Sequence, residues 1–311
     1  MSSVSSEDAE RDTVRESRPV HSEAVPASKE GMLKRERIVD EPNTPEHLQG
    51  VSGYKVQVPI EYGSNSRKPF GPVGAIVYTV FLYFAAQFGA ALALFGGLLA
   101  VGWGQKRAEQ WLAESVTGQF WFILIAEVLT VGTMIWLLRR RQVSVAKIGW
   151  NKPAWRYLGT ALLGFGVYFV GYVLVAAVVK QLIPALDFEQ KQQIGFDTAR
   201  TSEELMLTAI SLVVLPPLAE ELLFRGFLFS GLRNRFPFLP GAVVTSVLFG
   251  IGHLQFGSEV PLLWAAAIDT FVLSMVLCYL RERTGSLWPG IFIHALKNGL
   301  AFSVLFLFKL W

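Results

Sequence analysis

Long apolar segments are the feature that most constrains how this chain can fold. From about residue 73 onward they recur at roughly the 20-residue length that an α-helix needs to cross a bilayer. Charged residues make up only 17% of the 311 residues. The sequence therefore predicts an all-α fold, a polytopic transmembrane helical bundle with about 7–8 spans. We place seven of them at 73–103, 118–138, 157–179, 205–230, 239–256, 260–280 and 288–309.

The first part of the chain has a different composition. Residues 1–70 are rich in Ser, Glu, Arg and Pro and contain few large apolar residues. Such a segment cannot bury enough surface to offset its ordering entropy, so we expect a disordered N-terminal tail. The first apolar segment starts near Val73, which is too late for a secretory signal peptide. Beyond the tail we expect N-terminal transmembrane helices and a loop over 71–203, a second group of helices over 204–302, and the end of the last helix at 303–311.

The loops differ in their content of Lys and Arg. Short cytoplasmic loops carry an excess of these residues. The basic loops lie on the side of the N-terminal tail, so we expect an integral protein of the cell membrane with its N-terminus in the cytoplasm. The basic residues after the second, fourth and sixth segments are Arg139, Arg140, Arg141, Lys147, Lys152, Arg156, Arg233, Arg235, Arg281 and Arg283.

The chain contains a single cysteine, Cys278, which excludes an intramolecular disulfide. Nothing in the sequence indicates nucleic-acid binding or a particular oligomeric state.

Two adjacent glutamates, Glu220 and Glu221, lie inside an apolar segment, with Arg225 following. Charge at membrane depth is costly unless it is paired or hydrated, and it therefore suggests a functional site. Glu221 and Arg225 are four residues apart and can pair on one helix face. Glu220 points about 100° away and has no such partner in its own helix, which suits a general base. The alternative is a buried ion-pair network that only holds helices together.

Other polar residues interrupt the apolar segments. Pro216 and Pro217 precede the two glutamates and should kink or break the helix, so that a fresh helix starts there. Lys297 and Asp269 are the remaining intramembrane ionisable residues that we single out. We expect each of these two to have a structural role, either by pairing with another charge or, for Lys297, by extending its ammonium group to the membrane surface.

Two histidines stand in later apolar segments. His253 follows Phe249 by four residues, and His294 precedes Asn298 by four, so each pair shares a helix face. An imidazole and an amide side by side can donate hydrogen bonds to an oxyanion. The alternative for His294 and Asn298 is a hydrogen-bonded pair between helices, which membrane bundles commonly use.

These motifs, Glu-Glu-x-x-x-Arg, Phe-x-x-x-His and His-x-x-x-Asn in that order on apolar helices, resemble the CPBP family. These are the CAAX prenyl protease and bacteriocin-processing intramembrane endopeptidases, which include the type II CAAX prenyl endopeptidases. The resemblance covers residues 204–302. It implies an endopeptidase without a cofactor, in which Glu220 and His253 activate a water. It further implies that His294 and Asn298 hold the oxyanion, while Glu221, Arg225 and Phe249 support these groups.

The resemblance leaves alternatives open. Glu220, His253 and His294 could instead be three ligands of a zinc ion with an open position for water. A non-catalytic immunity or scaffold protein, or a transporter with a proton relay, would also contain intramembrane charges. The substrate of a protease would be a peptide or protein segment that enters from the membrane or its cytoplasmic edge; a prenylated CAAX tail and another membrane-associated protein are the alternatives. Straight helices would place His253 and His294 at different depths, so we expect a short, tilted or broken fifth helix.

Overall fold

The computed structural model describes residues 70–190, 194–255 and 262–308, and all structural statements concern this part of the chain. The predicted disordered tail at 1–70 lies outside the described residues except for its last position. The described residues form helices and contain no strand, so the prediction of an all-α fold is confirmed. The elements are α1 (Pro72–Ala100), α2 (Gln105–Glu114), α3 (Val116–Arg140), α4 (Arg156–Leu182), α5 (Ser202–Ala209), η2 (Ile210–Val214), α6 (Leu215–Glu220), η3 (Glu221–Phe229), α7 (Ser230–Arg233), α8 (Phe238–Ile251), α9 (Trp264–Thr284), α10 (Trp288–Phe302) and η4 (Ser303–Leu307).

Six stretches of helix are long and apolar enough to cross a membrane. The protein is therefore an integral membrane protein. The prediction of a fifth span at 239–256 is corrected by the structure, because the helix there, α8, has only 14 residues. Such a helix is about 21 Å long, shorter than the roughly 30 Å hydrocarbon core. The six are Pro72–Ala100, Val116–Arg140, Arg156–Leu182, Ser202–Arg233, Trp264–Thr284 and Trp288–Leu307.

Helix α8 ends where the sequence places glycine. The chain turns at Gly252 and His253, and the amide of Leu263 then donates to the carbonyl of Leu254. The short helix expected from the positions of the two histidines is thus present. His253 lies in this turn and packs against the ring of Phe249 in α8.

The helix from Ser202 to Arg233 is continuous but irregular. Pro216 and Pro217 occupy the first turn of α6, where a missing backbone donor costs least. The segment just before them, η2, is π-helical, as is η3, which starts at Glu221. A π-helical insertion lets a helix pass proline without breaking. The predicted fresh start at the prolines is therefore a local change of helix type within one long element.

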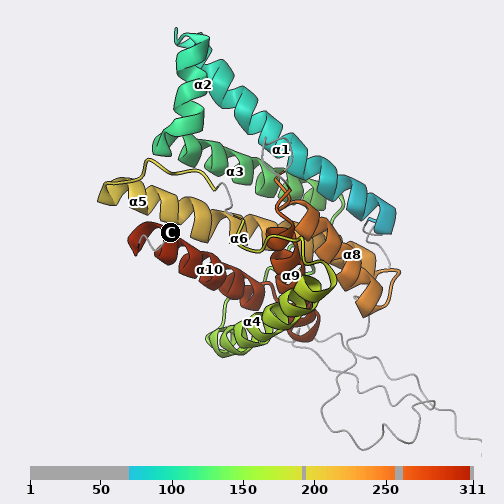
Figure 1. The fold of residues 1–311 in the computed structure, drawn as a ribbon. Coiled ribbons are helices and arrows are strands. Elements are labelled where there is room, and N and C mark those ends of the chain that lie inside the picture. The colour runs from blue at the N-terminus through green and yellow to red at the C-terminus, as the bar shows by residue number, and fades with distance from the viewer. Residues whose placement is uncertain (1–69, 191–193, 256–261, 309–311) are drawn as a thin grey trace, which may run out of the picture. The chain divides into compact units, whose positions relative to one another are not determined.

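This long helix lies between α3 on one side and α10 on the other (Figure 1). Helix α3 pairs with α1 and also contacts α6, while α10 contacts η2 and α6 from the other side (Figure 1). Helices α4, α9 and α10 pack together, and α8 packs closely against α9. The largest apolar cluster joins residues of α1, α3, η3 and α8, with Phe249 and Leu228 among its buried members. The fold therefore surrounds the Glu-Glu segment with helices from both halves of the chain.

The close approach of α8 and α9 depends on Gly250. A Cβ at this position would lie 2.8 Å from the carbonyl oxygen of Ala267. We predict that Gly250→Ala lowers the free energy of unfolding by about 1–3 kcal/mol, because two backbones must separate. A matched control is Gly132→Ala in α3, where a Cβ meets nothing within 4 Å. Unfolding in detergent with increasing SDS measures the stability of both variants. Equal stability of the two variants would contradict the prediction.

Candidate active site

The charged centre of the site is the pair of Glu221 and Arg225 in η3. Oε1 of Glu221 accepts a hydrogen bond from Nη1 of Arg225 at 2.8 Å, and both side chains are buried, at 1% and 0% exposure. The pairing expected from their spacing is therefore present. The guanidinium of Arg225 also lies 4.3 Å from the ring centre of Phe249 in α8. One cation thus links the long helix to α8 through charge and through the face of an aromatic ring.

Helix α10 approaches this pair through Gly290. A Cβ at Gly290 would lie 2.6 Å from Oε2 of Glu221, so only glycine leaves room for the carboxylate. One turn further along α10, Nδ1 of His294 lies 3.5 Å from Oε1 of Glu221. The sequence resemblance assigned Glu221 to the support of Glu220. In the structure the group that Glu221 approaches on α10 is His294.

His294 lies between the two carboxylates of the Glu-Glu segment. Its Nε2 is 3.8 Å from Oε2 of Glu220, on the opposite side of the ring from Glu221. The ring is 4% exposed and stands edge to face with Phe249 at 5.9 Å. When Nδ1–H points to Glu221, Nε2 is the nitrogen directed to the site.

His253 lies just after the end of α8 and contacts Phe249. Its Nδ1 is 2.8 Å from the carbonyl oxygen of Phe249, and its ring packs on the Phe249 ring at 4.7 Å. The Glu220 carboxylate lies within electrostatic range of this imidazole. A hydrogen bond from Nδ1–H to the carbonyl leaves Nε2 as the acceptor. Oε2 of Glu220 is buried and has no hydrogen-bond partner among the described residues.

Asn298 lies one turn beyond His294 on α10. Its Nδ2 donates to the carbonyl oxygen of Leu212 at 2.9 Å. Leu212 belongs to η2, where π-helical geometry changes which carbonyl groups are used within the helix. The structure thus brings Glu220, His253 and His294 together and places Asn298 at their edge, joined to the long helix. Its role at an oxyanion stays a prediction.

Two half-buried residues outside the motifs lie within electrostatic range of Glu220. They are Glu127 of α3 and Tyr83 of α1. Both come from the N-terminal group of helices, outside the three motifs. The signal for Glu127 was present in the sequence, because it is the sole acidic residue of the apolar segment 118–138.

Lys297 and Asp269 pair with one another, as a structural role requires. Nζ of Lys297 is 2.8 Å from Oδ2 of Asp269, and the Tyr168 hydroxyl donates to Oδ1 of the same carboxylate. The three side chains join α10, α9 and α4. This network ties α10 to α9 and α4.

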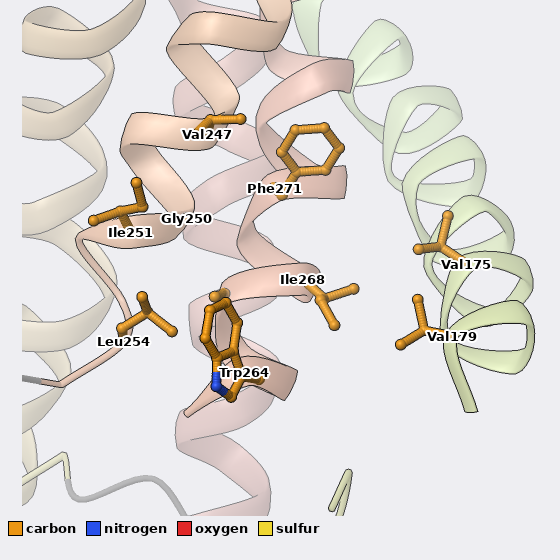
Figure 2. A pocket seen from close by; sticks show the side chains of 10 residues that line it. Val175, Val179, Val247, Gly250, Ile251, Leu254, Trp264, Ile268 and Phe271 are labelled. Atoms are coloured by element: carbon orange, nitrogen blue, oxygen red, sulfur yellow. The ribbon is translucent and has the colours of Figure 1, made fainter. Parts of the chain in front are cut away.

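An apolar pocket of about 240 Å³ lies between α4, α8 and α9 (Figure 2). It contains no titratable side chain, so it is distinct from the charged site, although it adjoins His253 through the neighbouring Leu254. Its lining residues are Val175, Val179, Val247, Gly250, Ile251, Leu254, Trp264, Ala267, Ile268 and Phe271. Within the described part of the chain, no three His, Cys, Asp or Glu side chains are grouped as metal ligands.

Comparison with known proteins gives a family match and two relatives. Residues 202–300 match the family described as type II CAAX prenyl endopeptidase Rce1-like, a family of membrane proteases, which confirms the resemblance over this segment. An "Uncharacterized 24.3 kDa protein" of Escherichia coli is 28% identical over 153 residues, 48% of this chain and 63% of that protein. The "Putative membrane peptidase YdiL" of Bacillus subtilis is 33% identical over 94 residues, 30% of this chain and 34% of that protein. The chain thus covers less than two thirds of either relative, and no solved structure matches it.

The buried Glu221–Arg225 pair gives a prediction about stability. Removing one partner leaves an uncompensated buried charge, so we expect Arg225→Met to lower the free energy of unfolding by about 3–5 kcal/mol. The double variant Glu221→Gln/Arg225→Met removes both charges and should recover most of this loss. Unfolding with SDS in detergent provides the double-variant cycle. Additive effects of the two single changes would show that the pair does not act as a unit.

Proposed function

We propose that this protein is an intramembrane endopeptidase in which Glu220 activates the attacking water. The observation that carries the proposal is the position of Glu220. Its carboxylate faces His294 at 3.8 Å and interacts with His253, while the neighbouring Glu221 is already bonded to Arg225. A carboxylate between two imidazoles, enclosed by apolar helices, suits general-base chemistry. The Rce1-like match over 202–300 supports the same class of reaction.

The proposed reaction begins with a water between Glu220 and His253. Glu220 takes a proton from this water as its oxygen attacks the peptide carbonyl carbon, and Nε2 of His253 accepts the second hydrogen bond. The carbonyl oxygen becomes an oxyanion, which His294 and Asn298 stabilise as donors. Glu220 then returns the proton to the departing amine nitrogen. Helices that exclude bulk water strengthen each of these electrostatic interactions.

The role of His294 follows from its two neighbours. Oε1 of Glu221 lies 3.5 Å from Nδ1, and Oε2 of Glu220 lies 3.8 Å from Nε2, so the proposed arrangement of the ring directs Nε2 toward Glu220 and the site. In its protonated form the ring offers Nε2–H to the oxyanion, with Glu221 as counter-charge. Glu221 and Arg225 therefore position His294, and Gly290 allows the carboxylate to reach it.

The proposed substrates are peptide or protein segments at the membrane. They enter from the bilayer or from its cytoplasmic edge, and a prenylated CAAX tail is one member of this class. In the proposed orientation the protein lies in the cell membrane with its N-terminus in the cytoplasm, because Lys and Arg are concentrated in the loops on the side of the N-terminus.

The decisive test is Glu220→Gln in purified protein. The change keeps size and hydrogen bonding but removes the base, so we expect kcat for peptide cleavage to fall by about 100-fold or more. Glu109→Gln on exposed α2 is the matched control and should leave activity unchanged. Unfolding measurements accompany both variants. A Glu220→Gln protein that stays folded and active would refute the mechanism, whereas unfolding would indicate a structural cluster.

Chelation separates the glutamate mechanism from the zinc alternative. We expect the wild-type protein to keep its activity after treatment with a strong chelator, and to contain no stoichiometric metal by elemental analysis. Loss of activity on chelation, with recovery on adding zinc, would instead make Glu220, His253 and His294 metal ligands. Absence of any peptide cleavage over a broad substrate set would favour a non-catalytic membrane protein.

A further inference from the structure

Helix α2 connects two membrane-spanning helices and is itself too short to cross. Helix α1 ends at Ala100 and α3 begins at Val116, and both are long and apolar enough to span the bilayer. The 10 residues of α2 extend only about 15 Å, half of the hydrocarbon core. Figure 1 shows α2 lying across the neighbouring ends of α1 and α3, both of which it contacts. The connection between two spans therefore places α2 at the membrane surface.

Tryptophan side chains gather at this end of the two spans. Trp103 precedes α2 and Trp111 lies on it; both are half-buried, and their ring centres are 6.0 Å apart in an edge-to-face arrangement. Trp121, in the second turn of α3, is 44% exposed. Tryptophan is enriched at the level of the lipid headgroups, where one side of the ring meets apolar groups and its N–H meets polar ones. The three rings thus mark the depth of the headgroup layer.

The basic residues of α2, Lys106 and Arg107, are exposed at the same level. Among the described residues, neither forms an ion pair with a carboxylate. The guanidinium of Arg107 lies 4.0 Å from the ring centre of Trp103, which holds this cation beside the tryptophan pair. The two carboxylates of α2 each accept a hydrogen bond from the glutamine four residues earlier, in the pairs Gln105–Glu109 and Gln110–Glu114. Two positive charges at the membrane surface are therefore left without an acidic partner.

The end of α2 is tied to the helix that carries the candidate site. The carbonyl oxygen of Glu114, the last residue of α2, accepts a hydrogen bond from the Thr198 hydroxyl at 2.8 Å. Close by on α3, Oε1 of Gln119 accepts from the amide of Phe196 at 2.6 Å. Thr201 then caps α5, the first part of the long helix. A fixed depth for α2 therefore also holds the start of the long helix.

We propose that α2 is a docking surface for anionic phospholipids. Trp103 and Trp111 lie among the glycerol and ester groups, while Lys106 and Arg107 bind the phosphate groups of the same lipids. Amphipathic helices with basic residues on the polar face and tryptophan on the other bind anionic membranes in this way. A lipid is the occupant because the cations lie beside tryptophan rings at the ends of two spans, so that a ligand must present a phosphate and an apolar body together. Lipid binding here requires no peptidase activity.

Fluorescence quenching at α2 tests the proposal in the full-length protein. Gln110→Cys introduces an exposed thiol one turn after Lys106 for attachment of a fluorophore, whereas the native Cys278 is buried. The labelled protein is placed in vesicles of phosphatidylcholine and phosphatidylglycerol in equal amounts, with a nitroxide on the headgroup of one lipid or the other. We expect the phosphatidylglycerol label to quench about two- to fivefold more strongly, because the two cations enrich the anionic lipid around α2.

Two matched double variants identify the cations. Lys106→Gln/Arg107→Gln should bring the ratio of the two quenching strengths to about one, since the attraction is lost. Lys152→Gln/Lys180→Gln removes two exposed charges elsewhere and should leave the ratio unchanged. Added salt should lower the wild-type ratio. A wild-type ratio near one, or one that Lys106→Gln/Arg107→Gln leaves unchanged, would overturn the proposal. Absence of quenching by either label would also overturn it, because α2 would then lie away from the bilayer.

Discussion

The ion pair between Glu221 and Arg225 is the interaction on which the rest of the site depends. Both charges are almost fully buried, so each would be costly alone at membrane depth. Pairing within one turn of η3 reduces this cost and directs three further contacts. The carboxylate lies next to Gly290 and His294 of α10, and the guanidinium lies over Phe249 of α8. Three elements are therefore brought together around one pair of opposite charges.

Irregular helices place the remaining groups. In a bilayer every backbone group must be satisfied internally, so departures from α-helical geometry need compensation. The π-helical segment η2 supplies a carbonyl that Asn298 uses, and the short helix α8 lets the chain turn at Gly252, where His253 packs against the ring of Phe249. Both departures from a regular, full-length helix, the π-helical η2 and the short α8, therefore lie next to the site. Strained and irregular segments are often found at functional sites.

The N-terminal half of the chain contributes specific contacts to the site. The loop after α3 anchors the start of α10, because the amide of Leu287 donates to the carbonyl of Gly149 and the side chain of Asn151 donates to the carbonyl of Gly285. Gly149 has φ +94°, and a Cβ there would meet the Arg281 guanidinium at 2.7 Å. The two hydrogen bonds between this loop and the segment before α10 set the position of the helix that carries Gly290 and His294. Together with Glu127 and Tyr83, the loop makes the site a product of both halves of the chain.

The sequence by itself determined the all-α membrane fold, the pairing of Glu221 with Arg225, and the pattern of residues that gather around Glu220. These features depend on local periodicity and on the cost of charge in a bilayer, which are properties of short segments. Tertiary structure decided that the chain turns after the 14 residues of α8, that Glu221 approaches His294, and that Glu127 of α3 lies within electrostatic range of Glu220. Each of these depends on which helices pack together and at what depth, and spacing along the chain does not encode distances between segments that are far apart in sequence.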